Sequence, residues 1–507
     1  MGREVGAVFV AAKGRADYPC PMLKKIGIGL LVILLILVAF GAYLYRGNPA
    51  DLSTEATEGT DPTIAEPEAE RFPTVAIAEP VGWPDDATPE AAEGLTVQRF
   101  AVGLDHPRTM IVLPNGDVLV AETSSPPREM GGIEGFIAKL LFSRAGAAVP
   151  SANRISLLRD ADGDGVAEAK STLLTEGLDS PSGMAWRDGV LFVANHDELL
   201  AFPMPEGATE ITEEPTKLMD LPAAGNHWMR NVLLSPDGSK VYVAVGSASN
   251  IGENGMEVEE GRATIWEYNL ETNRQRMWAG GLRNPNGMDW NPASGEMWTV
   301  VNERDMLGGD LVPDYLTNVP VGAQYGWPWL YWGDNVDSRV DAPRPRFLAE
   351  YTRKPEYALG AHTAPLGMVF ARGGERLGSR YANGAFVARH GSWNRKPPAG
   401  YDVVFVPFDE RGNPLGKPLE ILTGFLTGDG KTYGRPTWVA IDANGGLLVT
   451  DDTAGIVWRV ISPSAEPSPT VEPLKRATTP TRSLRGSSAT FQSDGIRQDA
   501  VRAAPKN

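Results

Sequence analysis

Short apolar runs, bounded by Gly, Pro, Asn and Asp, recur along the chain from residue 96 to residue 462. Many of them come in pairs across a tight turn, as where Asp188-Gly189 separates the apolar runs 183–186 and 190–194. Residues of the turn types tolerate the positive φ that tight hairpins require. The pattern therefore predicts β-hairpins in this part of the chain.

The hairpin unit repeats six times. Its copies begin near Gly103, Gly177, Leu233, Gly281, Ala364 and Gly424. Spacings of roughly 50 to 80 residues leave room for two further strands in each unit. Six four-stranded units close into a ring, which protects the sheet edges by radial repetition. We therefore predict an all-β fold, a six-bladed β-propeller over residues 96–462.

Composition agrees with this fold and excludes several functions. The 507-residue chain contains 56 Gly and 41 Pro, which favour many short turns, and 13 Trp contribute to a sizeable core. A net charge of -17 argues against a nucleic-acid partner, because phosphates would be repelled. Cys20 is the only cysteine, so the chain has neither a disulfide framework nor a covalently attached c-type haem.

An uninterrupted apolar run at residues 26–45 precedes the repeats. At helical rise it spans about 30 Å, the thickness of a bilayer core, so it predicts a transmembrane anchor. Basic residues in 1–25 and acidic residues after Arg46 place the N-terminus in the cytoplasm and the body outside it. A cleaved signal peptide is the alternative, because Ala39 and Gly41 are small enough for a cleavage site. Both interpretations export the body.

Two segments flank the repeats and differ from them in composition. Residues 46–95 are rich in Pro, Ala, Thr and acidic residues, which predicts an acidic linker without a core. Residues 463–507 are rich in Pro, Ser and Thr but basic, which predicts a disordered tail.

The fourth unit carries the densest polar signal. Residues 281–290 form a loop and a strand, and a second strand at 297–301 leads into Asn302-Glu303-Arg304-Asp305. A hairpin returns the chain to the end where it began, so Arg283 and Asn302 are expected at the same end of one sheet.

Because the unit repeats, the same end of every hairpin is expected on one face of the ring. That face would collect Arg108, Glu122, Asn195, His227, Arg283, Asn302, Glu303, His362, His390, Arg435 and Asp451. All five histidines of the chain fall at or near such loops. The arrangement predicts a polar pocket at the mouth of the channel. Arginines there suit an anionic ligand, because guanidinium binds carboxylates in a bidentate manner.

Two features stand apart from this pocket. Asp160, Asp162 and Asp164 alternate before Gly165, as in calcium loops, although Ser171 stands where a twelfth-position acid is expected; an Asp/Gly-rich turn is the alternative. Residues 123–150 carry apolar side chains at helical spacing. Such a helix packs on the body or, alternatively, forms a lid or a docking surface for an electron acceptor.

Four motifs carry a family resemblance. They are Asn226-His227, Leu282-Arg283-Asn284-Pro285-Asn286-Gly287, Tyr325-Gly326-Trp327-Pro328 and His390-Gly391-Ser392-Trp393-Asn394-Arg395. In combination they resemble the sorbosone dehydrogenase family, part of the broader family of soluble glucose and sugar dehydrogenases that depend on pyrroloquinoline quinone (PQQ). The resemblance covers about residues 96–462.

The resemblance implies PQQ bound over the channel mouth and gives roles to individual residues. His227 matches the general base that takes a hydroxyl proton. Arg283 and Asn284 match a pair that contacts the cofactor, the arginine stabilising charge on the quinone oxygen. Arg435 matches an arginine for a cofactor carboxylate, and either His390 or Arg395 matches a cationic contact.

The resemblance also implies a calcium ion beside the cofactor. In the glucose-oxidising branch the ion is held mainly by backbone carbonyls after the second strand of the fourth unit, which here is the run that begins at Asn302. Asn302 is therefore assigned to the cofactor site, and Glu303, Asp305 and Asp310 are expected as side-chain ligands. In that branch an acid directly precedes the base, whereas here the residue before His227 is Asn226.

Three functions remain open. The leading one is a membrane-tethered quinoprotein of the periplasmic side of the inner membrane, which oxidises a sugar or a related alcohol or aldehyde. It would pass electrons to a membrane quinone or cytochrome c. The second is a calcium-dependent sugar lactonase using Glu122, Asn195, Asn302 and Asp451. The third is a non-catalytic propeller that serves as a binding module.

Overall fold

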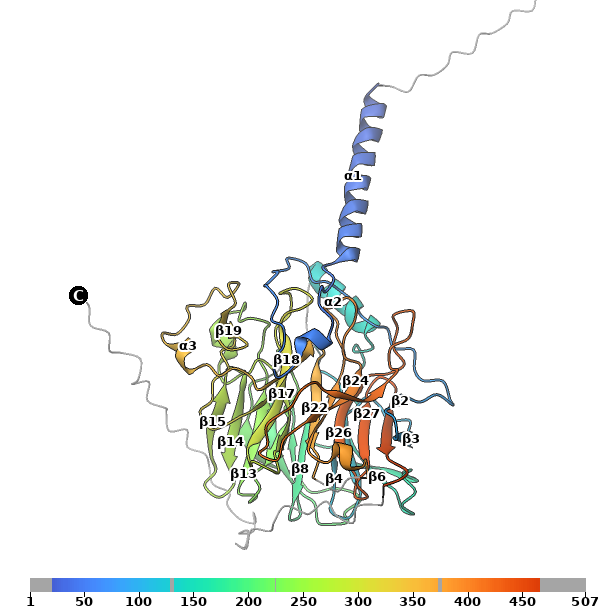
Figure 1. Ribbon diagram of the computed structural model, residues 1–507, viewed down its shortest axis with the longest axis vertical. Helices are drawn as coiled ribbons and strands as arrows, with labels where there is room; N and C mark the ends of the chain where they lie inside the picture. Colours follow the sequence, from blue (N-terminus) through green and yellow to red (C-terminus); the bar gives the residue numbers. More distant parts are fainter. Residues whose placement is uncertain (1–20, 128–131, 224, 373–375, 466–507) are drawn as a thin grey trace, which may run out of the picture.

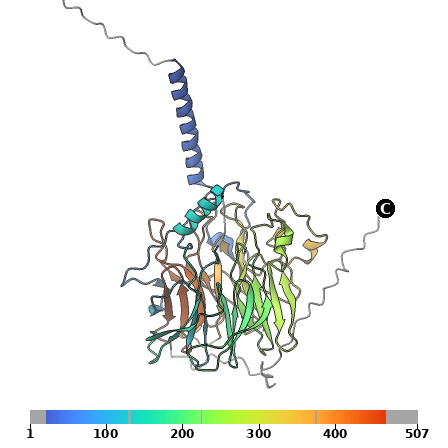
Figure 2. The ribbon, with the colours of Figure 1, turned by 180° about the vertical axis from the view of Figure 1, so that it is seen from behind.

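The computed structural model describes residues 21–127, 132–223, 225–372 and 376–465. In this part of the chain six antiparallel sheets of four or five strands stand around a common axis (Figures 1 and 2). The sheets follow one another in chain order, and each has its first strand innermost. The prediction of an all-β, six-bladed propeller is therefore confirmed.

The first three blades are simple four-stranded meanders. Blade 1 contains β4 (Pro107–Val112), β5 (Val118–Glu122), β6 (Arg154–Arg159) and β7 (Ala169–Leu174). Blade 2 contains β8 (Gly183–Arg187), β9 (Val190–Ala194), β10 (Glu198–Pro203) and β11 (Thr216–Asp220). Blade 3 contains β12 (Val232–Leu234), β13 (Lys240–Val245), β14 (Thr264–Asn269) and β15 (Arg274–Gly280).

The last three blades each take a strand from the N-terminal part of the chain. Blade 4 contains β16 (Pro285–Trp290), β17 (Met297–Val301), β18 (Pro313–Asn318) and β21 (Tyr357–Ala361), with β1 (Glu58–Gly59) at its edge. Blade 5 contains β22 (Pro365–Phe370), β23 (Gly384–Arg389), β24 (Asp402–Pro407) and β25 (Leu419–Thr423), with β2 (Glu90–Ala91) at its edge. Blade 6 contains β26 (Pro436–Ile441), β27 (Leu447–Asp451), β28 (Ile456–Ile461) and β3 (Thr96–Ala101).

The ring closes through apolar packing between neighbouring blades and through blade 6 itself. The innermost strands β4, β8, β12, β16, β22 and β26 contact one another in cyclic order. In β5, Leu119 and Ala121 pack against blade 2, while Val118 and Val120 pack against blade 6. This division follows from the alternation of side chains along a strand. Pairing of β28 with β3 joins the end of the propeller to its beginning.

Residues 47–95, here named the strap, lie against the propeller. The strap contributes β1 and β2, and it donates and accepts backbone hydrogen bonds with loops of blades 4, 5 and 6. This differs from the linker without a core that its composition suggested. The segment is held by its backbone amides and carbonyls, which find partners on loops distant in the sequence. Contacts of this kind need no apolar periodicity, so the composition did not predict them.

Helices are few. α1 (Pro21–Arg46) projects from the side of the disc where α2 (Gly132–Arg144) lies, as both ribbon views show. α3 (Leu348–Tyr351), the single-turn helices η1 (Glu55–Thr57), η2 (Met256–Glu259) and η3 (Ser379–Tyr381), and the hairpin β19 (Leu330–Tyr331)–β20 (Asn335–Val336) belong to loops. Among the described residues, no helix has the length and apolar character needed to cross a membrane. The anchor expected at residues 26–45 is therefore not confirmed, and residues 1–20 and 466–507 lie outside the described part of the chain.

Candidate functional site

The loops that the repeat pattern predicted on one side of the ring lie on one face of the disc. Each innermost strand begins on this face, and each second strand ends on it; this face is the mouth. The histidines lie there: His106 precedes β4, His196 follows β9, His227 precedes β12, His362 follows β21 and His390 follows β23. Because a hairpin returns to the end where it began, the repeat thus places histidines from blades 1 to 5 on one side of the disc.

His227 has a defined tautomer. Its Nδ1 lies 2.9 Å from the carbonyl oxygen of Ser247 and 3.0 Å from the hydroxyl of the same residue. A carbonyl oxygen only accepts hydrogen bonds, so Nδ1 carries the proton in the neutral ring. The basic nitrogen of His227 is then Nε2, as a general base requires.

A close approach of backbone joins His227 to the motif of the fourth blade. A Cβ placed on Gly246 would lie 2.4 Å from Oδ1 of Asn284 and 2.6 Å from Cβ of His227. Gly246 therefore keeps open a contact that any side chain would block. Asn284 in turn donates from Nδ2 to Oδ1 of Asn302 at 3.3 Å, which joins the two ends of the first hairpin of blade 4 beside the histidine.

Arg283 is buried and fully engaged at the end of blade 4. Its guanidinium donates to the carbonyl oxygens of Asn302 and Glu303 at 3.3 and 2.5 Å, and to the carboxylate of Asp305 at 3.1 Å. It also donates to the side chain and carbonyl of Asn250 in blade 3. These contacts bring Arg283 and Asn302 together, as the hairpin predicted, and hold the guanidinium in one place.

Asp305 also binds His362, which enters from the start of blade 5. The Nδ1 of His362 lies 3.5 Å from the carboxylate of Asp305. Burial raises the pKa of Asp305, but the hydrogen bond from His362 and the positive charges of Arg283, His362 and His227 outweigh burial and lower it. Burial lowers the pKa of His362, but Asp305 outweighs burial and raises it. This half of the mouth therefore favours a charged histidine.

A second buried carboxyl lies behind this pair. Asp314 in β18 accepts hydrogen bonds from the backbone amides of Glu303 and Ala364 at 2.7 and 2.8 Å. Burial raises the pKa of Asp314 to about 7 in spite of these donors. Asp314 thus fixes the backbone of the Asn302–Asp305 loop, a role that no sequence pattern indicated.

On the other side of the mouth, Arg435 is buried at the start of blade 6. Its Nη2 donates to the carbonyl oxygen of Ala78 in the strap at 3.1 Å, and its guanidinium lies 5.3 Å from the ring centre of Tyr401. Its backbone amide donates to Asp451 at 2.8 Å. Asp451 was expected at the mouth, and the structure assigns its carboxylate to holding this loop.

Beside Arg435, Asp452 joins residues of blades 1 and 5. Its Oδ2 accepts from Nε2 of His390 at 2.9 Å and also pairs with Arg108. The guanidinium of Arg108 lies 5.7 Å from the ring centre of Trp228, next to His227. Asp452 went unnoticed in the sequence, although it directly follows the second strand of its unit, where the other polar residues of the mouth stand.

His390 is neutral in this environment. Burial lowers its pKa to about 4, aided by the charges of Arg435 and Arg108, although Asp452 acts in the opposite direction. Because its Nε2 donates to Asp452, the ring offers a lone pair only at Nδ1. His390 therefore lies at the mouth as expected, but it does not supply the cationic contact that the resemblance implied for blade 5.

Arg395, the alternative for that contact, points elsewhere. It is buried and donates to the carbonyl oxygens of Leu52 and Pro397 at 2.8 and 3.1 Å and to Asp310 at 3.4 Å. The carboxylate of Asp310 accepts in turn from the backbone amides of Asp51 and Leu52. Both residues bind the strap, while Nε of Arg395 has no hydrogen-bond partner among the described residues. The assignments of Arg395 to the cofactor and of Asp310 to the metal therefore stay predictions.

The three carboxylates expected around calcium do not converge. Glu303 pairs with Arg304, Asp305 with Arg283 and His362, and Asp310 with Arg395. Within the described ranges, the one group of three or more potential metal-ligating side chains is Asp160, Asp162, Asp164 and Glu168. Its carboxylates also accept backbone amides of the same turn between β6 and β7, away from the mouth.

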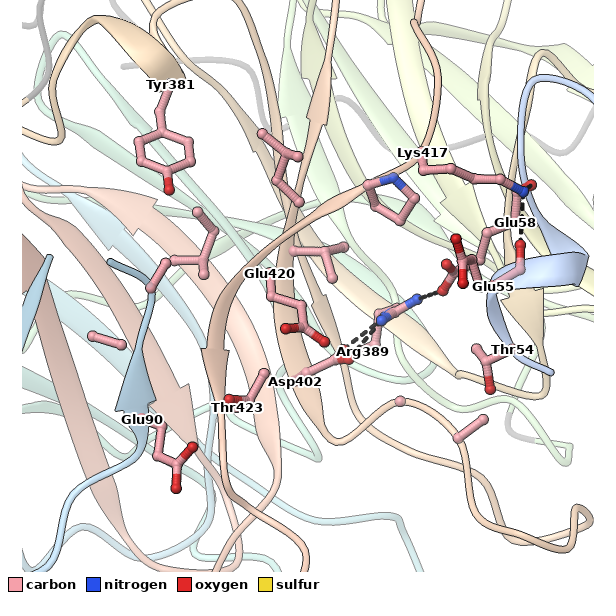
Figure 3. Close-up of a pocket in the computed structure, with 18 of the residues that line it drawn as sticks. Thr54, Glu55, Glu58, Glu90, Tyr381, Arg389, Asp402, Lys417, Glu420 and Thr423 are labelled. Atoms are coloured by element: carbon pink, nitrogen blue, oxygen red, sulfur yellow. Dashed lines mark hydrogen bonds and ion pairs between the residues drawn. The ribbon is translucent and has the colours of Figure 1, made fainter. Parts of the chain in front are cut away.

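A cleft of about 750 Å³ lies at the outer rim between blades 4 and 5 (Figure 3). Two of its cations bind the strap or blade 5: Arg389 pairs with Glu58 and Asp402, and Lys417 donates to the carbonyl oxygens of Glu55 and Glu58. The cleft is therefore where the strap binds the blades, and it is separate from the cluster at the mouth.

Two arginines of the mouth have unpartnered buried nitrogens. Nε of Arg108 and Nε of Arg435 are buried without a hydrogen-bond partner among the described residues, as are side-chain nitrogens of arginines elsewhere, among them Arg230 and Arg376. An unmade hydrogen bond to such a donor costs about 1–3 kcal/mol. The donor set suits a ligand that carries several carboxylates, as PQQ does. The carbonyls of Asn302 and Glu303 are oxygen ligands of the kind calcium prefers, and Arg283 uses one acceptor position on each.

Comparison with known proteins agrees with the fold and identifies a family. The family model described as TrAA12-like matches residues 139–320 and 343–464, more than half of the chain, so this protein belongs to the TrAA12-like family. An uncharacterised protein of Borreliella burgdorferi is 31% identical over 238 residues, 46% of this chain and 60% of its own length. A pyrroloquinoline quinone-dependent pyranose dehydrogenase of Coprinopsis cinerea is 28% identical over 305 residues, 48% of this chain and 41% of its own length. This chain thus covers less than two thirds of either relative.

Solved structures share the architecture. The calcium structure of the Trichoderma reesei family AA12 enzyme superimposes with a TM-score of 0.60 at 20% identity, covering 74% of this chain and 97% of the other. The holo PQQ domain of pyranose dehydrogenase from Coprinopsis cinerea gives a TM-score of 0.58 at 21% identity, covering 76% and 100%. At these identities the likeness establishes the fold alone.

Proposed function

We propose that this protein is a PQQ-dependent dehydrogenase that oxidises a sugar, either an aldose or a sorbosone-like aldehyde or related alcohol. The observation that carries the proposal is the mouth itself. Arg283, Arg435 and Arg108 lie on one face of the propeller with His227, whose Nε2 is basic. Membership of the TrAA12-like family and the similarity to a PQQ-dependent pyranose dehydrogenase support it.

The residues of the mouth divide the work. His227 accepts the proton of the substrate hydroxyl at Nε2, while Ser247 holds Nδ1 and so fixes the ring. When bound, PQQ supplies the two-electron acceptor for the hydride, which leaves the carbon that bears this hydroxyl. Arg283, held by Asn250 and Asp305, offers a fixed positive charge where negative charge develops. Arg435 and Arg108 bind carboxylates of the cofactor.

Calcium completes the proposed site. The carbonyl oxygens of Asn302 and Glu303 are the ligands that this chain offers, and Asp314 fixes their loop through the amide of Glu303. The calcium structure of the Trichoderma reesei enzyme supports a cation in this fold. Purified protein should bind PQQ with calcium and lose most of that affinity when a chelator removes the metal.

Reconstitution tests the function directly. The purified full chain, loaded with calcium and PQQ, is expected to show the absorption of the bound quinone and to reduce a redox dye when aldoses are added. A protein that binds PQQ but reduces dye with none of a panel of sugars and sugar aldehydes contradicts the substrate class. A protein that fails to bind PQQ contradicts the assignment itself.

A lactonase is less well supported by this geometry. Glu122 pairs with Arg154 and Ser156, Asn195 bonds the loop at Asp179, and Asp451 holds Arg435 and Trp83. The proposed ligands are therefore committed to separate contacts. Calcium-dependent hydrolysis of sugar lactones without PQQ would favour this alternative.

For the cellular setting, we propose that α1 tethers the protein to the inner membrane with the propeller on the periplasmic side. The exposed apolar side chains of α1, among them Leu35 and Ile36, support this. A tether would bring the mouth close to a respiratory acceptor, either a membrane quinone or cytochrome c. Recovery of the full chain in the soluble periplasmic fraction would contradict the tether.

A further inference from the structure

The strap follows the rim of the mouth over three blades. Asp51 and Leu52 bind the carboxylate of Asp310, and the amides of Glu68 and Glu70 donate to the carbonyl oxygens of Leu307 and Met306 in the blade 4 loop. Further on, the amide of Ala76 donates to the carbonyl oxygen of Trp393 in blade 5. The amide of Val81 donates to the carbonyl oxygen of Thr432, just before blade 6, and the amide of Thr432 donates to the carbonyl oxygen of Glu79. The segment therefore lies next to the loops that carry the site.

Its last contacts converge on Arg435. The carbonyl oxygen of Ala78 accepts from Nη2 of Arg435 at 3.1 Å, and Ala78 is itself 1% exposed. The ring of Tyr401 lies against the same guanidinium, with its centre 5.3 Å away. One end of Arg435 is thus fixed by a residue outside the propeller, while its Nε stays unpartnered among the described residues.

Trp83 holds the backbone that carries Arg435. The indole Nε1 donates to Oδ2 of Asp451 at 2.8 Å, and Oδ1 of that carboxylate accepts from the amide of Arg435 at 2.8 Å. Asp451 is fully buried and also accepts from Nε1 of Trp458 at 3.3 Å and from the amide of Ala454 at 3.2 Å, so loss of Trp83 would remove one of four donors to a buried carboxylate. Gly434 is part of the arrangement, because a Cβ there would lie 1.9 Å from the same carboxylate.

Aromatic packing fixes Trp83 in turn. Its ring centre lies 5.3 Å from those of Phe425 and Trp458 and 5.0 Å from that of Tyr433. These residues flank β26 and β28, so the indole is inserted into blade 6. The chain of contacts runs from the aromatic cluster through Trp83 and Asp451 to the backbone of Arg435, with Ala78 closing it on the guanidinium.

We propose that residues Ala78–Trp83 of the strap are a positioning element for Arg435, so that cofactor affinity depends on a segment outside the propeller. The proposal rests on the proposed function, because it concerns the arginine that binds a cofactor carboxylate. Trp83 and Ala78 touch no cofactor. They act by holding the backbone and the guanidinium of Arg435 in the orientation that faces the mouth.

Substitution Trp83→Phe tests this, with Trp186→Phe as the matched control. Both remove one indole N–H hydrogen bond and keep an aromatic ring, but Trp186 donates to the carbonyl oxygen of Met204 in blade 2. PQQ affinity of the calcium-loaded full chain is measured by absorption titration, and the melting temperature is measured in parallel. We expect Trp83→Phe to weaken PQQ binding by about tenfold, the scale of a hydrogen bond to a charged group, and Trp186→Phe to leave it within twofold.

A double-mutant cycle separates positioning from a general loss of stability. In an Arg435→Ala background the arginine is absent, so Trp83→Phe is expected to cause no further loss of PQQ affinity. An equal loss in both backgrounds, or an unchanged affinity of Trp83→Phe alone, overturns the positioning role and leaves the proposed function intact. A wild-type protein that does not bind PQQ overturns the proposed function and the positioning role together.

Discussion

The two halves of the mouth use the same residue types to opposite effect. Near blades 3 and 4, Asp305 lies between Arg283 and His362, and the pKa of this histidine is raised. Near blades 1, 5 and 6, Asp452 lies between Arg108 and His390, and the pKa of this histidine is lowered to about 4. The difference comes from the surroundings: two arginines act on His390, whereas Asp314 adds negative charge near His362. Charge at such a site depends on the complete set of neighbours.

The largest effect is expected where chemistry and binding separate. His227→Gln removes the proposed base beside the Arg283 half, so kcat should fall by about a thousandfold, within the range for general-base catalysis. PQQ affinity should change little, because the arginines that hold the carboxylates remain. Steady-state kinetics and a PQQ titration on the same sample check this. Activity within tenfold of wild type would remove His227 from the mechanism.

Stability should distinguish the two carboxylates next. Asp452→Asn removes a fully buried charge that pairs with Arg108 and His390, so we expect a loss of about 3 kcal/mol in the free energy of unfolding. Asp305→Asn affects a side chain that is 21% exposed, and about 1 kcal/mol is expected. Denaturant unfolding of both variants measures the order. A larger loss for Asp305→Asn would reverse the comparison.

A substitution of Arg395 should lower the stability of the fold without lowering the affinity for PQQ. Arg395→Met breaks the ties to Leu52 and Asp310, and the free energy of unfolding should fall by about 2 kcal/mol. Because the guanidinium contacts the strap, PQQ affinity should stay within a few-fold of wild type. Arg435→Ala, measured beside it, should show the reverse pattern. A large loss of PQQ affinity in Arg395→Met would restore the role implied by the family resemblance.

The smallest effect concerns His390 and pH. Its folded pKa of about 4 lies below the ordinary histidine value near 6.5, so the unfolded chain binds more protons between these values. His390 therefore contributes stability that is fully present above about pH 6.5 and is lost as pH falls toward 4. His390→Gln keeps an N–H donor and should lose less stability than wild type between pH 7 and pH 5. His196→Gln, on blade 2, is the control; equal pH slopes for wild type and His390→Gln would contradict a neutral histidine.

The repeat pattern predicted the fold correctly because each hairpin is formed by residues close together in the sequence. Turns such as Asp188-Gly189 and the apolar runs beside them fix strand pairs without knowledge of the rest of the chain. The same logic placed Arg283 near Asn302 and brought all five histidines to one face. These inferences needed only that a hairpin returns to its starting end.

Contacts distant in sequence were beyond the pattern. The strap has no apolar periodicity and is held by backbone hydrogen bonds to loops of three blades, so no pattern in its residues predicted where it lies. Arg395 lies in a motif that resembles a cofactor contact, yet its partners Leu52 and Asp310 are 343 and 85 residues away. Asp452 and Asp314 matter through neighbours from other blades, and no single segment records that.

The pairing of β28 with β3 has a consequence for the chain during its synthesis, before it has folded. Blade 6 is completed only when Thr96–Ala101 meets Ile456–Ile461. A polypeptide still being made therefore keeps an open gap beside blade 1 until nearly all of the propeller has been synthesised. Its exposed strand edge must be shielded through that interval, and a product that ends before Ile456 has no closed ring on which a mouth could form.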